Sequence, residues 1–336
     1  MRYYLGLDAG GTKTFCLIGD EQGHIKGFGR AGAGNYEVFG VQPALVENRK
    51  AIECALGDAG LTLKDIAGVG MGIAGADLPE DYVMLEREVY TPLFADTPRM
   101  FRNDSMGGLR GGTRNPYGIV IACGTGCVCA GVNRAGKYDR VGGLGDDFGD
   151  LVSGSSIGLR GIQTVWQARD GVIPATLLTG KFVERAGCKD VEDLFYKLYR
   201  RQLGYTDLQP MAKLVFDAAF EGDPAACDIL EWGGRYLGQM VNGVAVKLGM
   251  CQEEFEVVMA GSVFKGRSPV LADAMRTVIH RVCPKAETVM PVFEPVVGTL
   301  LMGMELDIQV TEGVYRTLSR DLLEMEKKYQ VKFMAK

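Results

Sequence analysis

The stretch Leu5-Gly6-Leu7-Asp8-Ala9-Gly10-Gly11-Thr12-Lys13-Thr14 decides the fold class. Residues 2–7 are typical of a buried strand, and a second strand is predicted at 15–18, directly after the glycine turn. Glycines let backbone N–H groups approach a polyphosphate closely, so the turn is a candidate phosphate site. A Walker A loop is excluded, because the lysine comes one place late and a strand follows where a helix should begin.

The other side chains of this turn suit a nucleotide. Thr12 and Thr14 can add hydroxyl donors, and Lys13 can add positive charge. Asp8 lies at the strand end and suits a hydrated Mg²⁺ ion, which prefers one or two carboxylates together with phosphate oxygens. Taken alone, a plain glycine-rich hairpin explains the same residues.

The same plan starts again further along the chain. Strand, glycine turn, strand, short turn and strand are predicted over 2–29 and again over 117–141, where Gly124-Thr125-Gly126 is the turn. Internal repetition of this kind predicts two similar lobes, each offering a glycine turn to a shared cleft, where the two turns can hold both ends of a triphosphate. Further strands are expected at 66–73, 99–101 and 256–259, and helices at 43–59, 81–90, 151–168, 190–199, 210–219, 225–248, 270–282, 298–307 and 313–328.

These elements predict an α/β fold with two lobes and a central cleft. The N-terminal lobe is expected over residues 1–113, and a larger C-terminal lobe with helical insertions over 114–336.

Asp104 is the candidate general base, because it follows a short predicted strand and precedes Gly107-Gly108. Phosphoryl transfer depends mostly on positioning and charge neutralisation, with one carboxylate to accept the proton of the acceptor hydroxyl. The alternative is that Asn103-Asp104-Ser105 only caps a helix.

Three further segments could contact ligands. The loop Gly142–Asp150 is rich in glycine and acids, so it could bind sugar hydroxyls or form a solvated turn. Asn35 is a candidate substrate amide or a turn asparagine. The strand Val257–Val263 ends in Ala260-Gly261-Ser262, small residues that let an adenine ring lie against the backbone or allow close strand–helix packing.

Composition excludes several classes of function. The net charge is −5 and no basic run is present, so no nucleic-acid partner is expected. No apolar stretch approaches the ~20 residues of a membrane span. Nine cysteines without a secretory signal indicate reduced thiols and a cytoplasmic location. Cys123, Cys127 and Cys129 could be imagined as metal ligands, but buried apolar cysteines explain them better.

Taken together and in order, these motifs resemble the BadF/BadG-type ATPase family, the branch of the actin-like ATPase and sugar kinase superfamily that includes N-acetylglucosamine kinases. The resemblance covers nearly the whole chain. Asp8–Thr14 and Ile121–Gly126 are similar to the two phosphate motifs, Gly32-Ala33-Gly34-Asn35 to a substrate segment, and Asn103-Asp104 to the catalytic aspartate segment. The other matches are Gly142-Gly143-Leu144-Gly145 with Gly149-Asp150 (sugar loop), Ala260–Val263 (adenosine motif) and Pro295–Gly298 (C-terminal segment).

The resemblance implies two ribonuclease-H-like lobes, with ATP and Mg²⁺ as cofactors and a small-molecule sugar as substrate. It implies transfer of the γ-phosphoryl group to a sugar hydroxyl with Asp104 as base. ATP would contact Gly10–Thr14, Gly124, Thr125, Gly126, Gly261 and Ser262; the sugar would contact Asn35, Asn103, Gly143 and Asp150; Asp8 would hold Mg²⁺ through water. A homodimer is compatible with the resemblance.

Two positions depart from the N-acetylglucosamine kinases of the family. Those enzymes usually carry a bulky aromatic where this chain has Leu144, and a glutamate where it has Leu151. Glucosamine, N-acetylmuramic acid or another sugar therefore stays open as the substrate. The alternatives are an iron–sulfur ATPase that activates a radical dehydratase or reductase, for which the cysteine spacing is wrong, and a non-catalytic sugar-sensing protein.

Overall fold

The computed structural model describes residues 1–335. They form two compact units. The first unit contains residues 1–120 and 131–137 and the chain from 289 onward; the second contains 121–130 and 138–288. Each unit combines helices with strands of a five-stranded sheet, so the α/β fold class is confirmed. The predicted division into lobes 1–113 and 114–336 stays a prediction.

The first sheet has the strand order β3-β2-β1-β4-β5. Strands β1, β2 and β3 form an antiparallel meander, whereas β4 and β5 run parallel to β1. The strands are β1 (Tyr3–Ala9), β2 (Thr14–Asp20), β3 (Ile25–Ala31), β4 (Ile66–Ile73) and β5 (Arg99–Asn103).

The second sheet has the order β10-β9-β6-β7-β8. If the five strands of each sheet are numbered in chain order, the two sheets have the same arrangement. From one edge to the other, it is third, second, first, fourth and fifth strand. The repeat predicted from the sequence is therefore confirmed at the level of topology. The strands are β6 (Gly118–Cys123), β7 (Cys127–Val132), β8 (Tyr138–Gly142), β9 (Phe255–Ala260) and β10 (Ala286–Val289).

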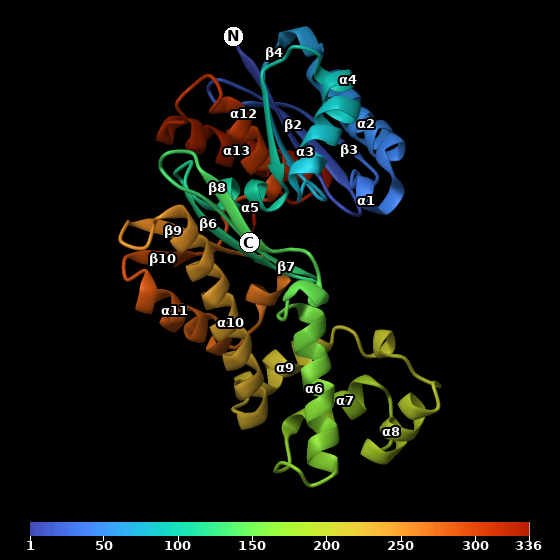
Figure 1. Cartoon of the computed structure of the whole chain (residues 1–336). Coiled ribbons are helices and arrows are strands. Elements are labelled where there is room, and N and C mark those ends of the chain that lie inside the picture. The colour runs from blue at the N-terminus through green and yellow to red at the C-terminus, as the bar shows by residue number, and fades with distance from the viewer. Residues whose placement is uncertain (336) are drawn as a thin grey trace. The chain divides into compact units, whose positions relative to one another are not determined.

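Helices cover both faces of the first sheet, which explains why β1 and β4 read as nearly continuous runs of apolar residues and glycine (Figure 1). One face packs Leu5, Leu7 and Val69 with α2 and α3, and the other packs Tyr4 and Leu17 with α12 and α13. The helices are α1 (Tyr36–Phe39), α2 (Val41–Ala59), α3 (Pro79–Leu85), α4 (Thr91–Phe94), α5 (Ser105–Gly112), α12 (Pro295–Met304) and α13 (Glu312–Tyr329), with short turns η1 (Leu63–Asp65) and η2 (Glu86–Tyr90).

Helix α12 lies directly on the backbone of β1 and β4. A Cβ atom at Gly6 would come 2.3 Å from the Leu300 nitrogen, and one at Gly70 would come 2.1 Å from the Thr299 oxygen. Nearer the helix C-terminus, Gly303 faces Gly68. The helix therefore runs antiparallel to the two strands, and its N-terminus lies toward their carboxyl ends.

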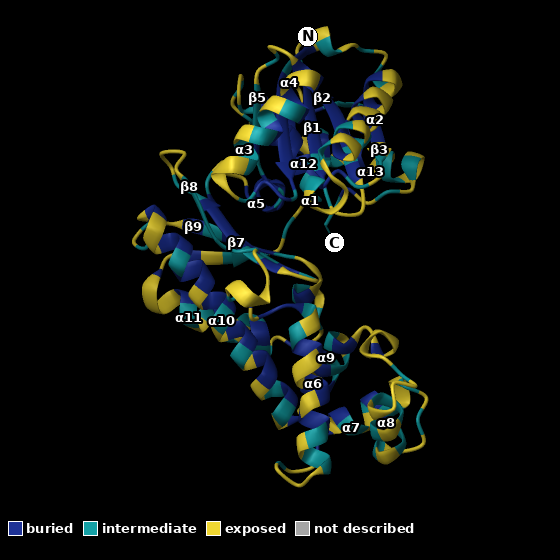
Figure 2. Cartoon of the chain, turned by 45° about the vertical axis from the view of Figure 1, so that its right-hand side comes forward, coloured by how far each residue is buried: buried dark blue, intermediate teal, exposed yellow. Residues whose placement is uncertain are grey.

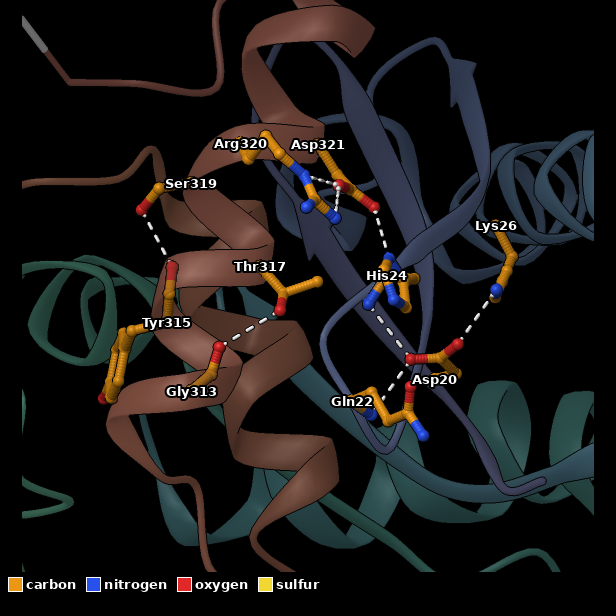
Figure 3. A network of polar contacts seen from close by, with 10 residues as sticks. All are labelled: Asp20, Gln22, His24, Lys26, Gly313, Tyr315, Thr317, Ser319, Arg320 and Asp321. Atoms are coloured by element: carbon orange, nitrogen blue, oxygen red, sulfur yellow. Dashed lines mark hydrogen bonds and ion pairs between the residues drawn. The ribbon is translucent and has the colours of Figure 1, made fainter.

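Helix α13 is fastened to the turn between β2 and β3 by a polar network (Figure 3). Asp20 accepts hydrogen bonds from the backbone N–H groups of Gln22 and His24 and pairs with Lys26, while His24 Nδ1 lies 3.0 Å from Asp321 Oδ2. Burial opposes ionisation of Asp20, but the hydrogen bonds from Lys26, His24 and Gln22 outweigh it and hold its pKa below the usual range.

The second unit carries the larger set of long helices. Helices α10 and α11 approach closely where α10 has glycine: a Cβ at Gly234 would lie 2.1 Å from the Leu271 oxygen. Figure 2 shows the alternation of buried and exposed residues along α10. The helices are α6 (Gly154–Arg169), α7 (Leu177–Arg185), α8 (Val191–Tyr199), α9 (Met211–Phe220), α10 (Pro224–Leu248) and α11 (Val270–Val282), with η3 (Asp146–Phe148), η4 (Tyr205–Leu208) and η5 (Ser262–Lys265).

Some element boundaries differ from the predictions for local reasons. Helix α6 begins at Gly154 and not at 151, because Ser153 caps it with a bond from the Ser156 N–H to Ser153 Oγ. Helix α12 begins at Pro295 and not at 298, since proline suits the first helical position. Helix α5 was not predicted, because its glycines have low helix propensity. Packing against α12 compensates for this cost in the folded chain. Within the described residues, no helix combines the length and apolarity that crossing a bilayer requires.

Candidate functional site

The predicted site residues fall into two groups, one in each unit. The first half-site contains Asp8–Thr14, Asn35, Asn103 and Asp104. The second half-site contains Gly124–Gly126, Gly143, Asp150, Gly261 and Ser262.

The first glycine turn closes the β1–β2 hairpin and leaves room outside it. The Gly10 N–H donates to the Lys13 carbonyl at 3.0 Å, which fixes the turn. Gly11, Thr12 and Lys13 are exposed, and a Cβ at Gly11 would meet no atom within 4 Å. The turn thus presents backbone to solvent with space for a ligand.

Two side chains of this turn have local contacts. Thr14 is fully buried, and its hydroxyl donates a hydrogen bond to the Gly32 carbonyl at 2.8 Å. This bond connects the turn to the segment 32–35. The Lys13 ammonium lies 4.4 Å from the centre of the Phe15 ring. Thr12 therefore offers the more accessible hydroxyl of the two threonines.

Asp8 and Asp104 lie at the carboxyl ends of β1 and β5, two parallel strands that flank β4. Asp8 is paired with Gly72 of β4, and a Cβ at Gly72 would lie 3.3 Å from the Asp104 Cα. Burial raises the pKa of Asp8 to about 7, together with the Asp104 and Glu294 carboxylates and against the opposing effect of Lys13. A half-buried carboxyl with so high a pKa, beside a second carboxyl, is a frequent mark of a functional site.

Asp104 is the N-cap residue of α5, yet its side chain makes no capping hydrogen bond. The helix terminus is served instead by Asn103, whose Oδ1 accepts bonds from the Ser105 N–H at 3.1 Å and the Ser105 hydroxyl at 2.7 Å. Asn103 Nδ2 donates to Asp77 Oδ1 at 2.7 Å. Asn103 therefore caps the helix and holds the backbone on which Asp104 is presented.

Asn35 is held in a similar way. It is buried, and its Oδ1 accepts the Glu37 N–H at 2.8 Å as the N-cap of α1. The backbone of Gly75 packs against it, because a Cβ there would lie 2.9 Å from Asn35 Oδ1 and 3.0 Å from Glu37 Cγ. The segment after β4 therefore lies beside the Gly32–Asn35 segment.

The second half-site brings the second glycine turn and the predicted adenosine motif together. The Gly124 N–H donates to the Gly126 carbonyl at 2.9 Å, and the Gly154 N–H at the start of α6 donates to the Gly124 carbonyl at 2.7 Å. Gly261 has a φ of 99°, and a Cβ there would lie 2.2 Å from the Cys123 oxygen. Only glycine allows this approach, since both the backbone conformation and the space exclude a side chain.

Asp150 organises the glycine loop that precedes it. Its buried carboxylate accepts three backbone N–H bonds, from Gly143 at 3.0 Å, Leu144 at 2.7 Å and Gly145 at 2.5 Å. Asp150 thus fixes the shape of the loop. Leu144 and the other side chains up to Phe148 are exposed.

The cysteines around the second glycine turn are buried, as predicted. The Cys123 thiol donates to the Val152 carbonyl at 3.5 Å, and a hydrogen bond with Cys123 together with burial raises the pKa of Cys127 far above its usual range. In the part of the chain that the structure describes, no group of three or more His, Cys, Asp or Glu is arranged to hold a metal ion directly.

Three acidic residues near the first half-site were missed in the sequence. Asp77 contacts Asn103, Glu37 lies beside Gly75, and Glu294 acts electrostatically on Asp8. Asp77 could have been found, because it comes shortly after β4, and ligands gather at the carboxyl ends of parallel strands. Glu294 could not, because its place depends on how α12 packs.

Comparison with known proteins gives consistent matches over most of the chain. The model of the BadF/BadG/BcrA/BcrD ATPase family matches residues 5–303. An N-acetyl-D-glucosamine kinase of Dictyostelium discoideum is 29% identical over 311 residues, 90% of this chain and 97% of that protein. An N-acetylmuramic acid/N-acetylglucosamine kinase of Clostridium acetobutylicum is 28% identical over 291 residues, 86% of this chain and 94% of that protein.

A solved structure supports the fold. A candidate N-acetylglucosamine kinase from Chromobacterium violaceum superposes with a TM-score of 0.62 at 24% identity, covering 90% of this chain and 99% of that one. At this identity the likeness concerns the fold alone. Since the family model spans nearly the whole sequence, the chain belongs to the BadF/BadG/BcrA/BcrD ATPase family.

Proposed function

We propose that this chain is an ATP-dependent kinase that phosphorylates a hydroxyl group of an amino sugar. The observation that carries the proposal is the pair Asp8 and Asp104, held at the carboxyl ends of parallel strands beside a glycine turn with open space. The two curated relatives described above are named as kinases of N-acetylated amino sugars, which gives the substrate class.

Asp104 is the proposed general base. Its carboxylate accepts the proton of the acceptor hydroxyl while that oxygen attacks the γ-phosphorus of ATP; the bond to the β,γ-bridging oxygen breaks, and ADP leaves. Asn103 and Asp77 keep this carboxylate in place, because the Asn103 amide is bonded on both sides to the neighbouring backbone and to Asp77. Their role is to position the base.

ATP is the proposed phosphoryl donor, bound by Gly10, Gly11, Thr12, Lys13, Thr14, Gly124, Thr125, Gly126, Gly261 and Ser262. The Asp8 carboxylate suits a hydrated Mg²⁺, since it is a hard oxygen donor at the strand end beside the phosphate turn. Asp8 would hold the hydrated ion, which when bound would neutralise phosphate charge.

The sugar is proposed to contact Asn35, Asn103, Gly143 and Asp150. Asp150 acts mainly through the loop whose N–H groups it fixes. Leu144 and Leu151, both partly exposed, replace residues typical of N-acetylglucosamine kinases and leave the choice of amino sugar open. We also retain a homodimer and a cytoplasmic location as proposals, which light scattering and cell fractionation would test.

A coupled ADP-release assay with Mg·ATP tests the function. The panel contains glucosamine, N-acetylglucosamine, N-acetylmuramic acid, N-acetylmannosamine and glucose. Strong turnover with one amino sugar is expected; a flat panel, with ATP binding demonstrated separately, would refute the kinase assignment.

The variant Asp104→Asn tests the assigned base. Loss of a general base lowers kcat by about 10²–10⁴-fold, while binding of ATP should persist. Asp96→Asn is the matched control, because Asp96 is an exposed acid of the same unit. A near-wild-type rate for Asp104→Asn would remove Asp104 from the mechanism.

A further inference from the structure

Two segments of the first half-site are fastened to the end of β1. The substrate segment, Gly32–Asn35, follows β3, and the Gly34 N–H donates to the Gly10 carbonyl at 3.0 Å. The loop 74–78 follows β4, and its first N–H donates to the Ala9 carbonyl at 2.9 Å. Both segments therefore start from fixed positions at the same edge of the first sheet.

A tyrosine hydroxyl joins these two segments to each other. Tyr36 directly follows the substrate segment, and its hydroxyl donates to Asp81 Oδ1 at 2.5 Å. Asp81 lies in the first turn of α3, shortly after the loop 74–78. Its other oxygen, Oδ2, accepts the N–H groups of Asp77 at 3.1 Å and Leu78 at 2.6 Å. Capping of α3 thus uses Oδ2, and the bond from Tyr36 to Oδ1 is additional to it.

The loop 74–78 in turn leads to the proposed base. Asp77, whose N–H is held by Asp81, accepts a hydrogen bond from Asn103 Nδ2 on its Oδ1 at 2.7 Å. Asn103 directly precedes Asp104 in the chain. A continuous series of hydrogen bonds therefore connects the residue after the substrate segment with the residue before the base.

Phosphoryl transfer makes the separation between the two ends of this series important. In the proposed function, the substrate segment contributes Asn35 to sugar binding, and Asp104 accepts the proton of the acceptor hydroxyl. A displacement of about 1 Å can lower a rate by about 100-fold, so the sugar and the base must be held at a fixed distance.

We infer that Tyr36 is a further positioning residue of the kinase reaction: its hydroxyl, bonded to Asp81, fixes the substrate segment against the loop that orients Asn103 and Asp104. The inference rests on the proposed function and deepens it. It separates the placement of the sugar relative to the base from the proton transfer itself, and it gives Asp81 a role beyond capping α3.

The variant Tyr36→Phe tests the inference, because it removes only the hydroxyl and keeps the partly buried ring that packs against the core. The kcat for sugar phosphorylation should fall on the order of tenfold. The KM for ATP should not change, since ATP is proposed to bind the glycine turns. Tyr329→Phe is the matched control, because the Tyr329 hydroxyl also donates to a carboxylate, that of Asp58, in the same unit.

A second measurement separates positioning from a general structural defect. Tyr36→Phe is combined with Asp104→Asn, and the rate of phosphoryl transfer is measured in single-turnover reactions for the wild type, both single variants and the double variant. If Tyr36 acts by placing the sugar relative to the base, its removal should change the rate of Asp104→Asn by less than about twofold. A structural defect would lower the rate by the same factor in both backgrounds.

A fall in kcat for Tyr36→Phe that is absent from Tyr329→Phe and from the Asp104→Asn background supports the inference. An unchanged kcat overturns it, and so does an equal factor in both backgrounds. A higher KM for the sugar with unchanged kcat also overturns it, because Tyr36 would then serve sugar binding alone. If the wild type phosphorylates none of the sugars in the panel, the proposed function fails as well. If the wild type is active and Tyr36→Phe behaves like Tyr329→Phe, only the role of Tyr36 is wrong.

Discussion

Replacing Asp150 with asparagine should disable the glycine loop while leaving the rest of the second unit folded. The carboxylate accepts three backbone N–H bonds, one on Oδ1 and two on Oδ2. An asparagine has one carbonyl oxygen, so at best it keeps two of these bonds and turns its NH₂ group toward the remaining N–H. At least one charge-assisted bond is lost, and one partly buried backbone N–H is left without its protein acceptor.

The cost follows from these bonds. A hydrogen bond to a charged group contributes about 1.5–3 kcal/mol, so the ordered loop is destabilised by roughly 2 kcal/mol or more. If the loop must be ordered to bind the sugar, the same free energy appears as a ~30-fold rise in the KM for the sugar. The KM for ATP should change by much less, because the second glycine turn is fixed by its own bonds to Gly126 and Gly154.

Steady-state kinetics with each substrate varied in turn, together with thermal melts, measure this. Asp147→Asn is the matched control, since Asp147 is an exposed acid of the same loop. Kinetic constants of Asp150→Asn that equal those of Asp147→Asn would refute the reasoning. A rise in the KM for ATP as large as that for the sugar would mean that Asp150 shapes the nucleotide turn instead.

Two further predictions concern stability. Because burial raises the pKa of Asp8 to about 7, the folded chain binds this proton more tightly than the unfolded chain, and wild-type stability should fall as pH rises from about 4 to about 7. In thermal melts without Mg²⁺, Asp8→Asn should therefore have a higher melting temperature than wild type at pH 8 but not at pH 4. An equal difference in melting temperature at both pH values would contradict this. Gly298→Ala would place a Cβ 1.9 Å from the Gly107 oxygen and should cost about 3 kcal/mol in chemical denaturation. The control is Gly57→Ala in α2, where an added Cβ would meet no atom within 4 Å, so this variant should be neutral or stabilising. A similar loss of unfolding free energy in the two variants would argue against close contact of α5 and α12.

Much of the candidate site could be predicted because its parts are local in sequence. The turn at Asp8–Thr14 lies between two strands whose apolar pattern is unambiguous, and the repeat at Gly124–Gly126 follows from the same pattern. What these residues do was harder to predict. Thr14 makes a structural hydrogen bond to Gly32 that depends on segments brought together by folding, whereas the bond from Glu37 to Asn35 is a local helix cap.

Sequence alone determined the α/β class, the repeated meander and the position of Asp104 at a strand end, because hydrophobic period and glycine turns are properties of short segments. Tertiary structure decided the rest. Helix α5 forms despite its glycines because those glycines let α12 approach, and α12 returns from the far end of the chain to lie on β1 and β4. Backbone meets backbone at Gly6, Gly70 and Gly298, and no local pattern encodes these contacts because the partners are far apart in the sequence.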